Sequence, residues 1–223
     1  MNFGNTTKAD VFDTLAVLVK ALANGRRLEL VELLAQGEHS VEDLARMSGT
    51  ALTTTSAHLQ TLKAAGLVRT RRQRTTIFYR LAGDDVVALF VAATKVALAR
   101  SPQLRDTLHL YLSEADGATA APTIDPAAVT SAMTVIDVRP AQEFSGGHFP
   151  GALSIPLADL SERAHQLPTD RPVVLYCRGE LCRLAHQAAH HLRERGYDAR
   201  AMDEGVLEWR ATGTIDLDLD PVA

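Results

Sequence analysis

Two cysteines are the residues of this chain best suited to carry chemistry, and the chain has no others: Cys177 and Cys182. Cys177 directly follows the apolar and aromatic run Val173–Tyr176, and a helical pattern begins at Leu184, so a tight loop separates a strand from a helix. Such a loop surrounds one sulfur with backbone N–H groups, which stabilise a thiolate, a bound oxyanion or a persulfide anion. We therefore expect Cys177 to be a nucleophile held as a thiolate. The alternative is a buried, inert cysteine.

Cys182 gives the pair a second reaction. If Cys177 carries a persulfide, a thiolate at Cys182 can attack it, which expels sulfide and closes a disulfide, or keeps the extra sulfur in a longer bridge. The pair would then behave as a switch. The alternative is that Cys182 packs beneath the loop as a small apolar residue. Two cysteines this close together do not form a disulfide framework for the fold.

Alternating strands and helices surround the cysteines in the second half of the chain. We expect strands over 134–138, 173–176 and 199–202, and a helix over 184–195 that ends at Gly196. The pattern indicates an α/β domain with a mainly parallel sheet at residues 124–223. The small, polar segment EADGATAAPT at residues 114–123 predicts a linker before that domain.

Helical periodicity dominates the first half, which we place at residues 1–113. The expected elements are helices over 9–36 with a break at Asn24-Gly25, over 40–47 and over 51–65, then short β-rich runs at 67–68 and 77–79 around a basic tip. This order predicts a winged helix-turn-helix, an α+β fold that is mostly helical. A long helix from Asp84 to Ser113 follows, and its apolar excess predicts pairing with a second copy.

Charge also differs between the halves. Residues 1–113 carry 14 Lys and Arg against 10 Asp and Glu, whereas residues 114–223 carry 9 against 17. The stretch 51–83 contains no acidic residue. Such a basic block suits a polyanion, although a solvated basic face that binds nothing would have the same composition.

The helix over 51–65 is the expected recognition helix, because its short polar side chains can reach base edges while Leu59 and Leu62 point inward. The basic hairpin would lie along the phosphate backbone. The expected DNA contacts are Thr53, Thr54, Ser56, His58, Gln60, Lys63, Arg71, Arg72 and Arg74.

The motifs ALANGRRLELVELLAQGEHSVEDLA, SAHLQTLKAAGLVRTRR and FYRLA occur in this order over about the first hundred residues. In this the chain resembles the ArsR/SmtB family of bacterial winged-helix repressors. The resemblance implies a homodimer formed through terminal helices and a pseudo-palindromic double-stranded DNA operator. Many members of that family sense metals through cysteines at the place of residues 37–43, where this chain has none. His39 with Glu38 or Asp43 could hold a cation, but a solvated or capping histidine is the simpler interpretation, and no metal site is expected.

The segments VIDVR, EF, GHFPGA, VLYCRG and EGVLEW follow one another between Val135 and Trp209. Here the chain resembles a single rhodanese domain, over about residues 124–217. The resemblance implies that Cys177 carries a sulfane sulfur as a persulfide and passes it on. Asp137 and Arg139 would tie a neighbouring loop, and His148 and Trp209 would be packing residues.

The loop departs from the usual rhodanese pattern at one position. Active members place an arginine five residues after the cysteine, whereas Cys182 stands there and Arg183 comes six residues after. The longer spacing resembles dual-specificity phosphatases and rhodanese-fold arsenate reductases, so Arg183 is a candidate anion ligand; the alternative is an exposed residue in the first helical turn. The backbone that would cradle the anion or persulfide belongs to Arg178, Gly179, Glu180 and Leu181.

Three functions are compatible with this combination. The first is a DNA-binding regulator, a repressor by its resemblance, whose thiols sense reactive sulfur or oxidants. The second is a sulfurtransferase or an arsenate-reductase-like enzyme tethered to a DNA-binding domain. The third is an inert rhodanese fold that serves as an interaction module.

The composition excludes several other classes of protein. Forty-six per cent of the residues are hydrophobic and 22% are charged, as in ordinary globular chains. No apolar run approaches the ~20 residues of a membrane-spanning helix, and the first residues lack a signal-peptide pattern. We expect a cytoplasmic protein without membrane contacts and without a cofactor.

Overall fold

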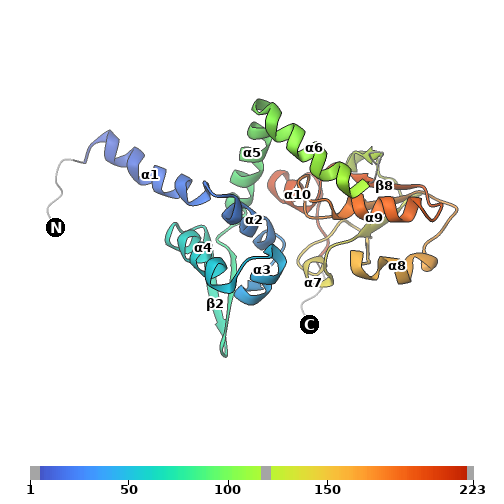
Figure 1. Cartoon of the computed structure of the whole chain (residues 1–223), viewed down its shortest axis with the longest axis horizontal. Helices are drawn as coiled ribbons and strands as arrows, with labels where there is room; N and C mark the ends of the chain where they lie inside the picture. The colour runs from blue at the N-terminus through green and yellow to red at the C-terminus, as the bar shows by residue number, and fades with distance from the viewer. Residues whose placement is uncertain (1–5, 117–121, 220–223) are drawn as a thin grey trace. The chain divides into compact units, whose positions relative to one another are not determined.

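A computed structural model describes residues 6–116 and 122–219 (Figure 1). The chain divides into two compact units, and the boundary falls after Phe90, inside a helix. The predicted linker at 114–123 falls partly on residues 117–121, which lie outside the described residues. The predicted domain limits therefore stay predictions.

The first unit is a helical core with a small antiparallel sheet. Its elements are α1 (Lys8–Leu22), α2 (Gly25–Leu34), β1 (His39–Ser40), α3 (Val41–Ser48), α4 (Leu52–Ala64), β2 (Val68–Gln73), β3 (Thr76–Leu81) and the start of α5 (Asp84–Arg100). Leu30, Leu44, Leu59 and Leu62 are fully buried among these helices. The predicted recognition helix is α4, and the predicted hairpin is β2–β3.

Local signals explain where these helices begin and end. The Ser40 hydroxyl accepts a hydrogen bond from the Asp43 N–H at 3.1 Å, which caps the N-terminus of α3. Gly49 ends α3 with a φ of 62°, in the left-handed region that glycine adopts without strain. Asn24 caps α2 in the same way as Ser40 caps α3.

The hairpin turns through Arg74 and Thr75, because Gln73 pairs with Thr76 at its tip. Arg74 has a φ of 57°, which the twist of a two-residue hairpin requires. The sheet order is β1-β3-β2. The two-residue strand β1, in which His39 pairs with Tyr79, was not predicted because it is too short for a sequence period.

The prediction of one helix from Asp84 to Ser113 is wrong. The chain forms α5 up to Arg100 and a separate helix, α6 (Pro102–Asp116). Pro102 cannot continue a helix, because it has no N–H and restricts the residue before it, but it is well suited to the first position of a new one. The Ser101 hydroxyl caps that new helix by accepting from the Leu104 N–H at 3.2 Å.

The second unit is an α/β layer structure. Besides α6 it contains β4 (Thr123–Ile124), η1 (Pro126–Ala128), β5 (Thr134–Asp137), α7 (Ala141–Phe144), β6 (Leu153–Ser154), η2 (Leu157–Asp159), α8 (Leu160–Arg163), η3 (Ala164–Gln166), β7 (Val173–Tyr176), α9 (Leu184–Arg193), β8 (Ala199–Met202) and α10 (Val206–Thr212). The five strands lie in the order β4-β8-β7-β5-β6, and every pairing is parallel.

The central strand β7 divides its side chains between two hydrophobic layers. Val173 and Leu175 pack with residues of α8 and α9, whereas Val174 and Tyr176 pack with Trp209 of α10. This alternation has the period of two expected of a strand covered on both faces. The predicted fold classes, a winged helix-turn-helix and an α/β domain with a parallel sheet, are confirmed. Within the described ranges, no helix is long and apolar enough to cross a membrane.

Candidate functional site

The cysteine loop lies between β7 and α9, as the sequence predicts, and α10 supports it from a distant part of the chain. The backbone N–H of Leu207 donates to the carbonyl of Arg178 at 2.9 Å. Gly205 lies so close that a Cβ there would be 2.4 Å from the carbonyl oxygen of Cys177. Only glycine fits at this point, so α10 can begin directly against the loop.

The two thiols form one hydrogen-bonded pair. Both cysteines are buried and neither is in a disulfide. The Cys177 thiol donates to the backbone carbonyl of Cys182 at 3.1 Å. A hydrogen bond from Cys177 lowers the pKa of Cys182 to about 6 against the opposing effect of burial, and the charge of Arg178 and the N–H groups of Leu184 and Arg178 add to it.

The pKa of Cys177 shifts in the opposite direction. Burial raises its pKa well above the ordinary value, and the hydrogen bond to Cys182 and the charge there raise it further. The N–H groups of Ala185 and Gly179 oppose the shift, as the sequence predicts, but burial outweighs them. These shifts run against a thiolate on Cys177 and favour one on Cys182. The expectation that Cys177 is the nucleophile stays a prediction.

Arg178 anchors the loop to a buried acid. Its guanidinium lies 2.6 Å from a carboxylate oxygen of Glu143, whose side chain has no exposed area. Sequence analysis identified Glu143 only as part of a motif, because a contact across 35 residues leaves no local signal. Arg178 thus has two effects: it neutralises Glu143 and favours the thiolate of Cys182.

The other predicted loop residues have different surroundings. Gly179 faces Glu208, since a Cβ at Gly179 would lie 2.9 Å from both carboxylate oxygens. Glu180 and Leu181 are half-buried. Arg183 lies over the ring of Tyr111 in α6, with 4.8 Å between its guanidinium carbon and the ring centroid. Its role as an anion ligand stays a prediction.

Sequence analysis contained Glu208 only as part of the EGVLEW motif, and its carboxylate links α10 to the loop. It accepts from the N–H of Gly205 at 2.9 Å and from the N–H of Glu180 at 3.5 Å. Burial raises the pKa of Glu208 to about 7, although these N–H groups oppose the shift. A buried acid beside a reactive loop is a signal that only the folded chain provides.

This pKa predicts a pH-dependent stability of the second unit. A glutamate of the unfolded chain has a pKa of ~4.3. Between that pH and about 7, Glu208 is therefore protonated in the folded state and ionised in the unfolded state. The contribution of Glu208 to the free energy of unfolding is fully present below the pKa of the unfolded chain. It is lost as the pH rises through the pKa of the folded state, about 7, and the total loss is about 3 kcal/mol.

Glu208→Gln should remove this part of the pH dependence. Urea unfolding at several pH values between 4.5 and 8 measures it, with the fluorescence of the single tryptophan, Trp209, as the probe of this unit. Parallel pH profiles for the wild type and the variant would contradict the assignment.

Two further predictions about this unit are confirmed. Arg139 and Asp137 are fully buried and paired, and Arg139 also donates to the carbonyl of Gly147 at 2.8 Å, which ties that loop. Trp209 is fully buried with its ring 5.5 Å from that of Phe149 and is a packing residue.

The predicted recognition helix α4 presents its polar side chains opposite the buried Leu59 and Leu62. Thr53, Thr54, Gln60 and Lys63 are exposed, and Ser56 and His58 are half-buried. The amide of Gln60 donates to the Tyr79 hydroxyl of β3 at 3.1 Å, so this side chain also braces the helix against the hairpin.

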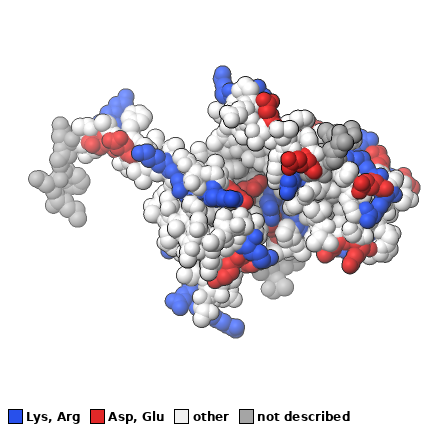
Figure 2. Space-filling model, in the orientation of Figure 1, with Lys and Arg blue, Asp and Glu red and all other residues white. Residues whose placement is uncertain are grey.

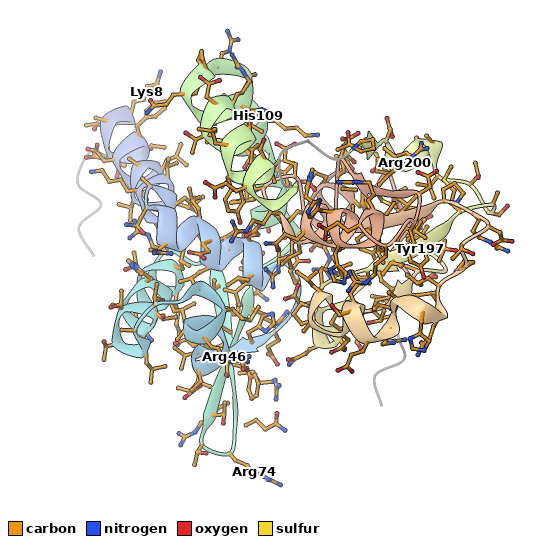
Figure 3. All side chains as sticks on the ribbon, turned by 45° about the vertical axis from the view of Figure 1, so that its right-hand side comes forward. Lys8, Arg46, Arg74, His109, Tyr197 and Arg200 are labelled. Atoms are coloured by element: carbon orange, nitrogen blue, oxygen red, sulfur yellow. The ribbon has the colours of Figure 1, made fainter. Side chains whose placement is uncertain are left out.

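The hairpin carries the predicted basic residues, and Figure 2 shows Lys and Arg side chains at its tip. Arg71 is paired with Glu38 at 2.5 Å and lies over the ring of Phe78. Arg72 donates to the backbone carbonyl of Arg74 at 3.0 Å. Arg74 itself projects from the end of the hairpin (Figure 3). Arg74 is therefore the arginine best placed to reach a phosphate, whereas Arg71 is already paired.

Helix α1 has an apolar face that the sequence analysis did not interpret. Only Ala21 is buried in this helix. Its exposed apolar residues are Val11, Phe12, Leu15, Val17 and Val19, each more than half exposed. Apolar periodicity predicts the helix but not whether its own chain covers it.

Metal ligands do not gather in the described part of the chain. Among residues 6–116 and 122–219, no group of three or more His, Cys, Asp or Glu side chains is arranged to hold a metal ion. His186, His190 and His191 are half-buried on α9. His191 lies 3.0 Å from the hydroxyl of Ser161, and His190 lies 3.5 Å from Glu194.

Comparisons with known proteins agree with both units. Residues 24–70 match the family model "Bacterial regulatory protein, arsR family", and residues 124–212 match the model "Rhodanese-like domain". The chain is 42% identical over 206 residues to the HTH-type transcriptional regulator Rv0324 of Mycobacterium tuberculosis, covering 92% of this chain and 91% of that one.

Two further similarities each cover one part of the chain. A sulfurtransferase of Allochromatium vinosum is 32% identical over 86 residues, which is 38% of this chain and 78% of that protein. The solution structure of the homodimeric winged helix-turn-helix DNA-binding domain of Mb0332 from Mycobacterium bovis is 49% identical, with a TM-score of 0.41, and covers 45% of this chain and 93% of that one.

Proposed function

The chain belongs to the ArsR-family transcriptional regulators that carry a C-terminal rhodanese-like domain, and from this premise we propose that it represses transcription as a homodimer and responds to reactive sulfur or oxidants through Cys177 and Cys182. The observation that carries the sensing part is the pair of buried free thiols, in which the Cys177 thiol donates to the carbonyl of Cys182. The lowered pKa of Cys182 supports it. We propose that the protein acts in the cytoplasm.

Operator binding is proposed through α4 and the hairpin. The exposed hydroxyls of Thr53 and Thr54 lie at the N-terminal end of α4, the part of a recognition helix that reaches base edges. A homodimer would present two such helices to a pseudo-palindromic site. The exposed apolar face of α1 supports a homodimer, because a second copy of this face would remove it from water.

Sensing is proposed to begin at Cys182. The thiolate attacks one sulfur of a disulfane or polysulfane, a bond forms from Cys182 to that sulfur, the original S–S bond breaks, and the departing thiolate takes a proton from water. Cys177 then loses its proton to water and attacks the sulfur of Cys182, which closes the Cys177–Cys182 disulfide and releases a second thiolate. The two cysteines are oxidised by two electrons. A disulfane donor is reduced to two thiols, and a trisulfane donor is reduced to one thiol and one hydropersulfide. With a peroxide, the intermediate is a sulfenic acid and water is released.

The sensor proposal predicts a response of operator affinity to oxidation of the pair. We expect the disulfide form, recognised by a loss of two hydrogens in the intact mass, to bind the DNA upstream of its own gene about 5- to 150-fold more weakly. Mobility shifts with and without a dialkyl trisulfide measure this. Cys177→Ser and Cys182→Ser should keep the basal affinity and lose the response; an unchanged affinity of the fully oxidised protein would refute the sensor.

The DNA-binding part predicts a separate effect at the tip of the hairpin. Arg74→Ala should weaken binding to any sequence by roughly three- to tenfold and reduce the slope of log affinity against log salt by about one per protomer, because one phosphate contact is lost. Arg200→Ala, which removes a half-buried arginine of the second unit that is paired with Asp198, is the control for net charge. Equal effects of the two substitutions would show that only net charge matters.

A sulfurtransferase is the second candidate. The similarity of the second unit to a protein named as a sulfurtransferase favours it, and the position of Arg183 six residues after Cys177 keeps an arsenate-reductase-like activity as a variant of it. Steady turnover of thiosulfate with cyanide, or of arsenate with a thiol, would support an enzyme. One modification per protomer without turnover supports the sensor.

A further inference from the structure

A cavity of about 230 Å³ lies beside the cysteine loop, and we name it the α6 pocket. Helix α6 packs against α9 in the second unit (Figure 1). Leu108 and Leu112 of α6, with Leu98 of α5, line one side of the pocket. Gly179 and Cys182 of the loop line the other side. The contact of Arg183 with Tyr111 holds the same two elements together beside it.

The pocket reaches only one of the two thiols. Cys182 is among its lining residues, whereas Cys177 is not; the Cys177 thiol donates to the carbonyl of Cys182 instead. A molecule that enters the pocket therefore meets Cys182, the thiol whose pKa is lowered to about 6.

The rest of the lining is mixed. Met202 adds to the three leucines, Thr123 is polar, and the carboxylates among the described lining residues are those of Glu180 and Asp203. Burial raises the pKa of Glu180, and the charges of Lys95 and Glu204 act on it in opposite directions. His186 of α9 also lines the pocket. Among the described residues that line the pocket there is no Lys or Arg, although the charges of Lys95 and Arg178 act on Glu180 and on Cys182 from outside the lining.

We propose that the α6 pocket delivers uncharged, apolar sulfur donors, such as dialkyl polysulfanes, to Cys182, and discriminates against anionic donors such as thiosulfate and inorganic polysulfide. Leucine and methionine side chains bind alkyl groups by excluding water. An anion would lose its hydration shell beside two carboxylates, which opposes its entry. This inference rests on the proposed sensing function and names the donor that the sensor takes.

Matched alkyl methanethiosulfonates test the proposal, since each is attacked by a thiolate at its sulfenyl sulfur and expels methanesulfinate. The probes are the ethyl reagent, which is neutral, and the 2-sulfonatoethyl reagent, which is anionic. In the full-length Cys177→Ser variant the adduct on Cys182 persists, because no second thiol displaces it. We expect the ratio of neutral to anionic rates to exceed that of N-acetylcysteinamide at least about tenfold. An equal ratio would overturn the proposal.

Two substitutions in the same background locate the cause of the selectivity. Leu108→Trp should fill the pocket and slow the neutral reagent at least about tenfold, while Asp203→Asn should keep the neutral rate and lower the ratio. If the leucine substitution disturbs α6 itself, the aspartate substitution still decides, because it changes charge at nearly constant volume. An unchanged ratio in Asp203→Asn would contradict exclusion by charge.

The outcome is separable from that of the sensor. A neutral preference at Cys182 together with an unchanged operator affinity of the oxidised protein would support the pocket and refute the sensing function. A response of DNA binding without a neutral preference would do the reverse.

Discussion

The wild-type protein is expected to show a thiolate absorbance near 240 nm at pH 7, and Cys182→Ser is expected to abolish it. With a pKa of about 6, Cys182 is roughly nine-tenths ionised at that pH, whereas an ordinary thiol is ionised to only ~3%. The difference is about thirtyfold. Cys177, the remaining thiol in this variant, stays protonated because it is buried.

Substitutions at Cys177 show whether its hydrogen bond or its sulfur atom lowers the pKa of Cys182. Cys177→Ser retains an O–H donor, so the pKa of Cys182 should remain low. Cys177→Ala removes the donor that contributes most to the shift, so that pKa should rise toward its ordinary value. Titration of the absorbance from pH 5 to 10 distinguishes the two. If Cys182→Ser still shows thiolate absorbance at pH 7, the thiolate is on Cys177, which would contradict the assignment of the low pKa to Cys182.

The order of elements was predictable because local signals mark it. The strand before Cys177, the helix after Leu184 and the caps at Ser40 and Gly49 depend on residues a few positions apart, and the structure has them where the sequence predicts. The same local reasoning could have found the helix break, since Ser101 and Pro102 are a capping residue and a favoured first helical residue.

The chemistry of the site was less predictable, because it depends on burial and on contacts between distant residues. Backbone N–H groups near Cys177 follow from the loop, but the cost of burying a charge there follows only from the fold. Glu143 and Glu208 reach the loop across 35 and 28 residues. Neither distance leaves a pattern in a single sequence, so the opposite directions of the two thiol pKa shifts could not be predicted from it.

Arg178→Met is expected to destabilise the second unit by about 3–5 kcal/mol. The substitution keeps the apolar length of the side chain but leaves the carboxylate of Glu143 buried without its partner, and an unpaired buried charge costs this much. The urea midpoint followed by Trp209 fluorescence measures the loss. A cost below about 1 kcal/mol would show that Glu143 is neutral or solvated when Arg178 is absent.

The double variant Arg178→Met/Glu143→Gln then separates stability from reactivity. Removing both charges should restore most of the stability, because no unpaired ion remains. The pKa of Cys182 should nevertheless be higher in the double variant than its wild-type value of about 6, because the charge of Arg178 is one of the causes that lower it. A stable double variant whose thiolate titrates as in the wild type would assign the low pKa to the hydrogen bond from Cys177 and the backbone N–H groups, without the charge of Arg178. A stable double variant with a raised pKa would show that the residue that anchors the loop also keeps Cys182 ionised.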